Sequence, residues 1–420
     1  MTLNAEAVHV LLAGSVVILA CLLRPSWILP TFIALTWMAI PASVYGGLPS
    51  PVEVGGLALL VFAAWRATRE REVAKPVLIV AALLGFAAVG TSLASPEYSS
   101  VPLKWLQSLS FLVIAALAVR DAEDVDRVAV ALCLVGSFLS LGAMYSVLVH
   151  PTEIFRLNEP VTGTQAARAA GPFGESNFFA LSLAAIGPLS VYMLTRSIPR
   201  RRALGIFTLC CLVGGVLSTG SRGGALALAA GLVAAWFALS ARRKRALIVS
   251  VLAVAALVPA FSAQIASSGE RTISGRETEN QIAIAMFGDH PVTGVGVDVY
   301  QTLYRSYSRD IGADPRMVRA PHSLPLQIAA EQGVFGIIAW LAAAIVVVGY
   351  VRTRRLWSLP LGRAVILSLT AYCVGSLFLH GSQINLLFVL TGLVFALGAR
   401  GYAYAPASVD RLELAGATSS

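Results

Sequence analysis

An arginine at the start of a predicted helix is the pattern in this chain most able to do chemistry. Arg222 follows Ser221, a residue type that caps helices, and opens an apolar run over 223–241. A cation is unfavourable there unless an anion binds, because the helix dipole already makes this end positive. Free backbone N–H groups and a planar guanidinium together form a strong phosphate site. The alternative is an interfacial arginine that extends toward lipid headgroups.

Two further arginines have related positions. Ser274 and Glu277 have the spacing of a capping box, which places Arg276 in the first turn of a predicted helix. The alternative is a surface ion pair between Arg276 and Glu277 or Glu279. Arg168 lies shortly before another apolar span, and taken alone it is more typical of a loop cation than of a ligand.

His322 is the candidate for proton transfer. It follows Pro321 and precedes Ser323, at the head of a predicted helix whose dipole disfavours the imidazolium and keeps the ring neutral. A neutral imidazole can accept a proton from a hydroxyl group. A single loop histidine can equally be structural. The chain has no HExxH spacing, so we expect chemistry without a metal and without a cofactor.

The composition indicates the kind of fold that positions these residues. The 420 residues are 57% hydrophobic and only 13% charged, with a mean hydropathy of +0.77. Soluble domains carry roughly 25% charged residues, so the chain is predicted to be an all-α polytopic membrane protein. The net charge of +9 then reflects membrane topology, and we expect no nucleic-acid partner. The five cysteines lie in apolar stretches without CxxC spacing, so neither disulfides nor a thiolate metal site is expected.

Intervals without charge predict the membrane spans. Besides the clearest intervals, which are given below, dividing 364–399 at the polar break 380–383 yields two further spans. The N-terminal region 7–65 is harder to divide into spans. We expect 12 or 13 crossings. The clearest intervals are 76–94, 105–119, 128–149, 176–195, 203–221, 223–241, 246–265 and 332–351.

Basic residues in short loops predict the orientation. Alternate loops, with Arg24, Arg400 and Arg411, hold 21 of the 31 Lys and Arg residues, and we assign that side to the cytoplasm. The loops are those around 66–75, 120–127, 196–202, 242–245 and 352–363. The candidate residues then lie on the outer face.

The predicted domain organisation follows from these spans. The large loop contains the candidate site, and the tail is expected to be cytoplasmic and disordered. The divisions are 1–149 for N-terminal spans, 150–175 for an external loop, 176–265 for central spans, 266–331 for a large external helical loop, 332–400 for C-terminal spans and 401–420 for the tail.

The large loop has a helical pattern of its own. Tyr300, Tyr304 and Tyr307 recur at helical spacing, which favours packing on the membrane domain over a stacking surface for sugars. It contains six arginines and eight carboxylates, so the loop is not basic overall. Any phosphate site in it must therefore be local.

Several segments resemble the O-antigen ligase and polymerase family. Residues 319–336 are similar to that family's signature around a histidine, and Gly275-Arg276 with 286–296 resembles its large-loop segment. Residues 217–224 resemble its Ser-Arg-Gly helix start, and 171–177 its earlier loop motif. The resemblance covers about 165–345.

This resemblance implies a C-type (GT-C) membrane glycosyltransferase in a bacterial cytoplasmic membrane. Its donor would be a glycan on polyprenyl (undecaprenyl) diphosphate, and its acceptor a glycan or glycolipid, at the periplasmic face among membrane lipids. Carried onto matching positions, Arg222, Arg276 and, more weakly, Arg168 would bind the donor diphosphate, and His322 would act on the acceptor hydroxyl. Ser323 departs from the family's usual Asn, which leaves that neighbour's role open.

Other classes remain open at this point. A polysaccharide polymerase would share the donor chemistry and differ in its acceptor. A lipid-linked glycan transporter usually has internal repeats and ionisable residues near mid-membrane, and this sequence shows neither. A peptidoglycan polymerase of the shape, elongation, division and sporulation family would be expected to use a carboxylate base. A membrane scaffold without activity is the fourth alternative.

Overall fold

The protein is an all-α polytopic membrane protein. Apart from one pair of short strands, every described element is a helix. The computed structural model describes residues 25–38, 51–95, 102–149, 156–158, 168–237, 272–312, 321–379 and 385–400.

The elements follow one another along the chain as mostly long apolar helices with short connections. They are η1 (Pro25–Trp27), α2 (Ile28–Met38), α3 (Pro51–Arg69), α4 (Arg71–Ala94), α5 (Leu103–Leu117), α6 (Ala122–Leu148), β1 (Arg156–Asn158), β2 (Arg168–Gly171), α7 (Ser176–Thr195), α8 (Pro199–Thr219), α9 (Arg222–Trp236), α12 (Thr272–Asp289), α13 (Tyr300–Asp310), α14 (Leu324–Thr353), η4 (Leu356–Ser358), α15 (Pro360–Ser376) and α16 (Asn385–Arg400).

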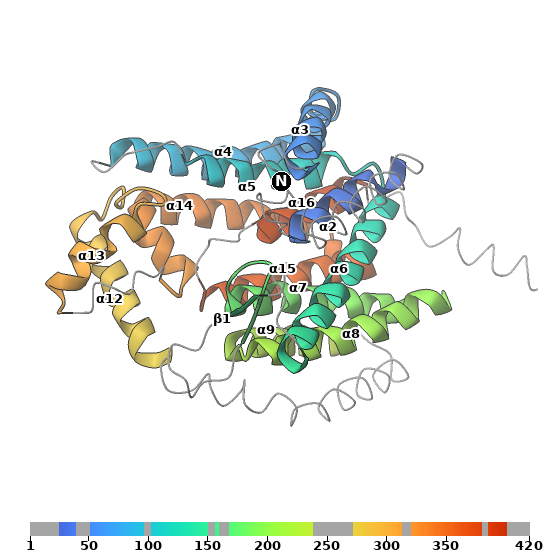
Figure 1. Ribbon diagram of the computed structural model, residues 1–420. Helices are drawn as coiled ribbons and strands as arrows, with labels where there is room; N and C mark the ends of the chain where they lie inside the picture. Colours follow the sequence, from blue (N-terminus) through green and yellow to red (C-terminus); the bar gives the residue numbers. More distant parts are fainter. Residues whose placement is uncertain are drawn as a thin grey trace, which may run out of the picture.

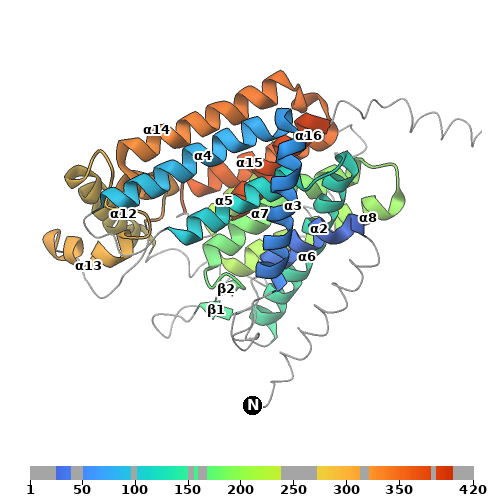
Figure 2. The same cartoon turned by 90° about the horizontal axis from the view of Figure 1, so that it is seen from above.

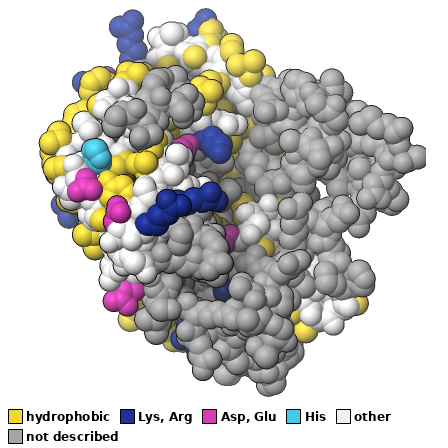
Figure 3. Space-filling view, turned by 60° about the vertical axis from the view of Figure 1, so that its left-hand side comes forward, with side chains coloured by type: hydrophobic (Ala, Val, Ile, Leu, Met, Phe, Trp, Pro, Cys, Tyr) yellow, Lys and Arg dark blue, Asp and Glu magenta, His cyan; other side chains and the backbone are white. Residues whose placement is uncertain are grey.

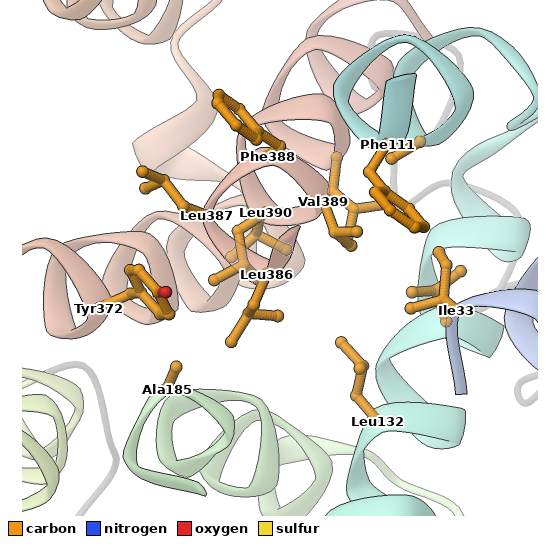
Figure 4. Close-up of a cluster of buried hydrophobic side chains, with 14 of the residues drawn as sticks. Ile33, Phe111, Leu132, Ala185, Tyr372, Leu386, Leu387, Phe388, Val389 and Leu390 are labelled. Atoms are coloured by element: carbon orange, nitrogen blue, oxygen red, sulfur yellow. The ribbon is translucent and has the colours of Figure 1, made fainter. Parts of the chain in front are cut away.

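Helix α7 is the most enclosed helix of the bundle. All of its residues except Asn177 and Thr195 are buried, between α8, α9 and α15. A helix that is apolar all round is typical of a bundle interior. Figure 4 shows how the core joins α7 to the other helices, with Ala185 facing Leu386 and Tyr372.

Basic residues gather at one end of the bundle. Arg66, near the end of α3, donates from Nη1 to the carbonyl of Val119 at 2.8 Å, just after α5. Arg201 Nη2, in the first turns of α8, lies 3.0 Å from Asp126 Oδ2 at the start of α6. Three of the predicted cytoplasmic clusters, 66–75, 120–127 and 196–202, therefore meet at this end.

The opposite end carries the candidate site residues. Helix α4 runs 24 residues and α8 runs 21 residues away from the basic end. At 1.5 Å per residue these helices are roughly 30–36 Å long, enough to cross a membrane. Figure 1 shows α12, α13, the start of α14 and the start of α9 toward its left-hand side, away from the α3 end of α4.

A small second core holds α12 and α13 against the start of α14. It contains Ile282, Ala283 and Met286 from α12, Tyr300 and Tyr304 from α13, and Ala330 from α14. The tyrosine stripe packs against other helices, but it does so in this second core with α12 and the start of α14, whereas the sequence predicts packing on the membrane domain. Figure 2 shows α4 and α14 side by side, leading away from this subdomain.

Helix α14 is broken at Gly333, which has φ +61°. The carbonyl groups left without a helical donor at the break are capped by the loop that joins α12 to α13. Val295 donates its N–H to the carbonyl of Ala330, and Gly296 donates to that of Glu331, both at 2.9 Å. The loop therefore satisfies the end of the first helical segment.

The same loop also caps the start of the second segment of α14. The N–H of Val334 donates to Pro291 O at 2.8 Å, and that of Phe335 donates to Val292 O at 3.1 Å. Ser95, at the end of α4, donates its hydroxyl to the carbonyl of Val295. Residues 291–296 thus tie α4 to both halves of α14.

The predicted spans agree with most of the described helices. Five helices, α4, α6, α7, α8 and α14, are long and apolar enough to cross a membrane, and α5, α9 and α16 are shorter apolar helices. The predicted span at 246–265, part of the N-terminal region 7–65 and the tail 401–420 lie outside the described residues. The total of 12 or 13 crossings therefore stays a prediction.

Two local predictions differ from the structure. Helix α12 begins at Thr272, so Ser274 lies inside the helix and the predicted helix start at the capping box is wrong. The packed positions from Ile282 onward stabilise this helix more than its N-terminal residue types do. The sequence predicts 150–175 only as an external loop of an all-α protein, yet β1 and β2 pair within it in antiparallel fashion, with Leu157 opposite Ala169.

Candidate functional site

Arg222 is the first residue of α9, as predicted. Gly220 ends α8 in the left-handed conformation at φ +59°, and Ser221 caps α9 by accepting the Gly224 N–H at 3.2 Å. This tight turn between two helices leaves Arg222 exposed beside the N–H groups of the first turn. The geometry can bind an anion, because both the guanidinium and the helix end are positive.

Arg168, the first residue of β2, contacts the same turn. From β2 it donates through Nε to the carbonyl of Thr219 at 2.6 Å, and its Nη2 lies 3.2 Å from Asn177 Oδ1 at the start of α7. The structure therefore brings Arg168 into contact with Thr219, three positions before Arg222. These contacts show that Arg168 holds the turn that precedes α9.

Arg276 lies in the first turns of α12, and its side chain lies outside the described part. Glu279, one turn further along, is described and is buried at 1% exposure. Residues three apart share one face of a helix. Arg276 therefore occupies a backbone position one turn before Glu279, the residue that contacts His322.

Glu279 contacts His322. The Nε2 atom of His322 lies 3.3 Å from Oε2 of Glu279, and the histidine side chain is 14% exposed. His322 stands just before Ser323, which caps α14 by accepting the Leu326 N–H at 3.5 Å. The predicted helix start is confirmed, and a carboxylate now faces the ring in addition to the helix dipole.

Tyr300 connects this contact to the second core. Its hydroxyl donates to the backbone carbonyl of Glu279 at 2.8 Å. Burial raises the pKa of Tyr300 well above its usual value, and the nearby Glu279, Tyr304 and Glu331 add to the effect. The hydroxyl therefore stays protonated and keeps donating.

The structure relates some of the predicted residues through intermediate residues. Arg168 contacts Thr219 in the turn that leads to Arg222, and Glu279, one turn beyond Arg276 on α12, contacts His322. Among the described residues, no hydrogen bond or ion pair joins Arg222 to Glu279 or His322. Both groups nevertheless lie at the end of the bundle opposite the basic clusters. Figure 3, which looks toward this side, shows charged side chains of both signs among apolar ones.

Sequence reasoning assigned no role to two features of this site. Glu279 entered only as an ion-pair partner for Arg276, although its place one turn along the same helix face could have indicated a shared site. The break in α14 was also missed. Its signal was Gly333 within an otherwise helical run. Within the described ranges, no group of three or more His, Cys, Asp or Glu side chains is arranged to hold a metal ion.

Comparison with known families addresses this part of the chain directly. Residues 206–341 match the family model described as O-antigen ligase. This segment belongs to the O-antigen ligase family. It begins within α8, ends within α14 and includes Arg222, Arg276, Glu279 and His322, whereas Arg168 precedes it. No curated protein matches the chain. The protein therefore carries the domain of an O-antigen ligase-type membrane enzyme, whose partners are a lipid-linked glycan and an acceptor.

Proposed function

We propose that the protein is a metal-independent, inverting glycosyltransferase. It moves a glycan from polyprenyl (undecaprenyl) diphosphate to an acceptor hydroxyl on the outer face of the bacterial cytoplasmic membrane, in the O-antigen ligase reaction. The observation that carries this proposal is the O-antigen ligase match over 206–341, which contains the helix-start arginines and His322.

The donor diphosphate would be bound by Arg222 and Arg276, with Arg168 at the turn before Arg222. The support is the exposed position of Arg222 at the first turn of α9, where guanidinium and backbone N–H groups can share phosphate oxygens. Negative charge grows on the leaving diphosphate as its bond to the sugar breaks. Fixed cations at that point lower the barrier because they stabilise this charge.

The acceptor would be activated by His322. Its imidazole takes the proton of the acceptor hydroxyl while that oxygen forms a bond to the anomeric carbon. The bond from the anomeric carbon to the diphosphate oxygen breaks, and its electron pair leaves with the diphosphate. Direct displacement inverts the anomeric centre.

The test is a transfer assay with the purified full-length chain. It is incubated with a lipid-linked oligosaccharide and candidate acceptors, and released polyprenyl diphosphate is measured. We expect His322→Ala to lose the general-base contribution, about 10²- to 10⁴-fold in rate, while donor binding survives. Near wild-type transfer by His322→Ala would overturn the base assignment. No release with any donor would overturn the enzymatic proposal.

The acceptor decides between ligation and polymerisation. A polysaccharide polymerase uses the same donor chemistry, so the donor half of the assay cannot separate the two. Deleting the gene and running the surface glycan on a gel gives the answer. Loss of all long chains from the surface lipid indicates a ligase, and caps of a single repeat indicate a polymerase.

A further inference from the structure

The contact between Glu279 and His322 joins a buried carboxylate to the proposed base. Glu279 is 1% exposed and His322 is 14% exposed, and their Oε2 and Nε2 atoms are 3.3 Å apart. Burying a carboxylate costs several kcal/mol unless a partner compensates for the lost hydration. A carboxylate beside an imidazole changes the proton affinity of the ring, so its effect is not limited to the stability of the fold.

The surroundings fix where this carboxylate can lie. Tyr300 donates its hydroxyl to the Glu279 carbonyl, and Ile282, Ala283 and Met286, one to two turns on, pack in the second core. The glutamate therefore sits on a rigid helix. His322 is similarly placed by Ser323, which caps α14 immediately after it.

The contact has a chemical consequence for the imidazole. A carboxylate near an imidazole favours the protonated, cationic form of the ring. When the ring takes a proton from the acceptor hydroxyl, it becomes cationic, and a carboxylate 3.3 Å away stabilises that cation.

We propose that Glu279 is the positioning residue for His322: its carboxylate, which faces the ring, stabilises the imidazolium formed during transfer. This inference rests on the proposed function. In the step, the hydroxyl proton moves to the His322 ring, the acceptor oxygen bonds to the anomeric carbon, and the diphosphate leaves with the electron pair of the broken bond.

If Glu279 only stabilised the fold, its substitution would lower the stability of the protein and leave the pH dependence of the remaining activity unchanged. Removing a carboxylate that faces the base makes the imidazolium less favourable. The base then stays unprotonated to lower pH. Tyr300 on α13 lies beside Glu279, and Tyr304 and Glu331 lie close to Tyr300.

The experiment compares Glu279→Gln with Glu277→Gln in the full-length protein. Glu277 lies two residues away on α12 and is exposed, so its substitution is the matched control. We expect Glu279→Gln to lower kcat/KM for transfer about 10-fold or more, with the loss mainly in kcat. The acidic limb of its pH profile should move down by about one pH unit or more. Glu277→Gln should match wild type in both.

The outcomes separate the two proposals. If Glu279→Gln keeps the wild-type rate and pH profile while His322→Ala is inactive, the positioning role is wrong and the proposed function stands. If His322→Ala retains transfer, the proposed base itself fails. Nitrogen-15 NMR of histidine-labelled wild-type protein, with His322 assigned by His322→Gln, measures the pKa of this ring and does not require Glu279→Gln to fold. A pKa below the ordinary histidine value of about 6.5 would overturn the inference.

Discussion

Arg168 donates a hydrogen bond from Nε to the backbone carbonyl of Thr219 at 2.6 Å, at the last residue of α8. A helix C-terminus is negative, so a cation there is favourable. The turn that begins at Thr219 ends at Arg222, the first residue of α9. One arginine therefore fixes the position from which a second arginine extends.

Substitution of Arg168 should weaken donor binding. Hydrogen bonds from a charged group contribute about 1.5–3 kcal/mol, so Arg168→Ala should raise the KM for the lipid-linked donor about 10-fold or more. Arg168→Lys should be intermediate, because it keeps the charge and loses the planar fork. Arg305→Ala, at an exposed position on α13, is the control. An unchanged donor KM in Arg168→Ala would show that the turn keeps its geometry without this contact.

Arg222 should matter more directly for the donor. Arg222→Ala removes a cation from the first turn of α9, and we expect at least a 10-fold loss in affinity for the lipid-linked donor and a lower kcat. Binding to the donor without an acceptor measures the first effect. Arg352→Ala removes an exposed cation from the last turn of α14 at the basic end and should leave donor affinity unchanged. Equal effects of the two substitutions would mean that Arg222 acts only through general membrane electrostatics.

The break in α14 gives a stability prediction with a matched control. A Cβ atom at Gly333 would lie 2.5 Å from the carbonyl carbon of Val292, and its φ of +61° is strained for other residues. Gly333→Ala should therefore destabilise the protein by about 2 kcal/mol or more. Gly349 lies in the same helix with nothing within 4 Å of its Cβ position, so Gly349→Ala should be neutral or slightly stabilising. Thermal unfolding in detergent measures both, and equal melting temperatures would contradict the proposed loop insertion.

Much of the fold could be predicted because membrane helices are set by composition. The interval 176–195 corresponds to α7 residue for residue, since a run of that length without charge has few alternatives. The turn before Arg222 was also predictable, because Gly220 and Ser221 are local signals that end one helix and begin the next.

The remaining features depend on contacts between distant segments. The insertion of residues 291–296 into the break at Gly333 joins backbone groups about forty residues apart, and no local pattern specifies which segment caps which helix. The Glu279–His322 contact is of the same kind. Sequence alone identified the histidine. The carboxylate that faces it required the packing of α12 against α14.

Glu331 is the second buried carboxyl group near the site, at 2% exposure. Its Oε2 accepts a hydrogen bond from Gln327 Nε2 at 3.2 Å, and the carboxyl also accepts from the backbone N–H groups of Asp298 and Tyr300. These contacts join the start of α13 to α14. They assign Glu331 a role in the fold, at the junction that carries His322.

This role predicts that the amide can replace the acid. Glu331→Gln keeps a carbonyl oxygen for the backbone donors, so we expect near wild-type transfer and a small fall in melting temperature. Glu331→Ala leaves buried N–H groups without an acceptor, at about 1–3 kcal/mol each, and should unfold several degrees lower. Transfer rate and melting temperature are measured for both variants. Glu331→Gln that unfolds normally and has no activity would identify Glu331 as the base and displace His322 from that role.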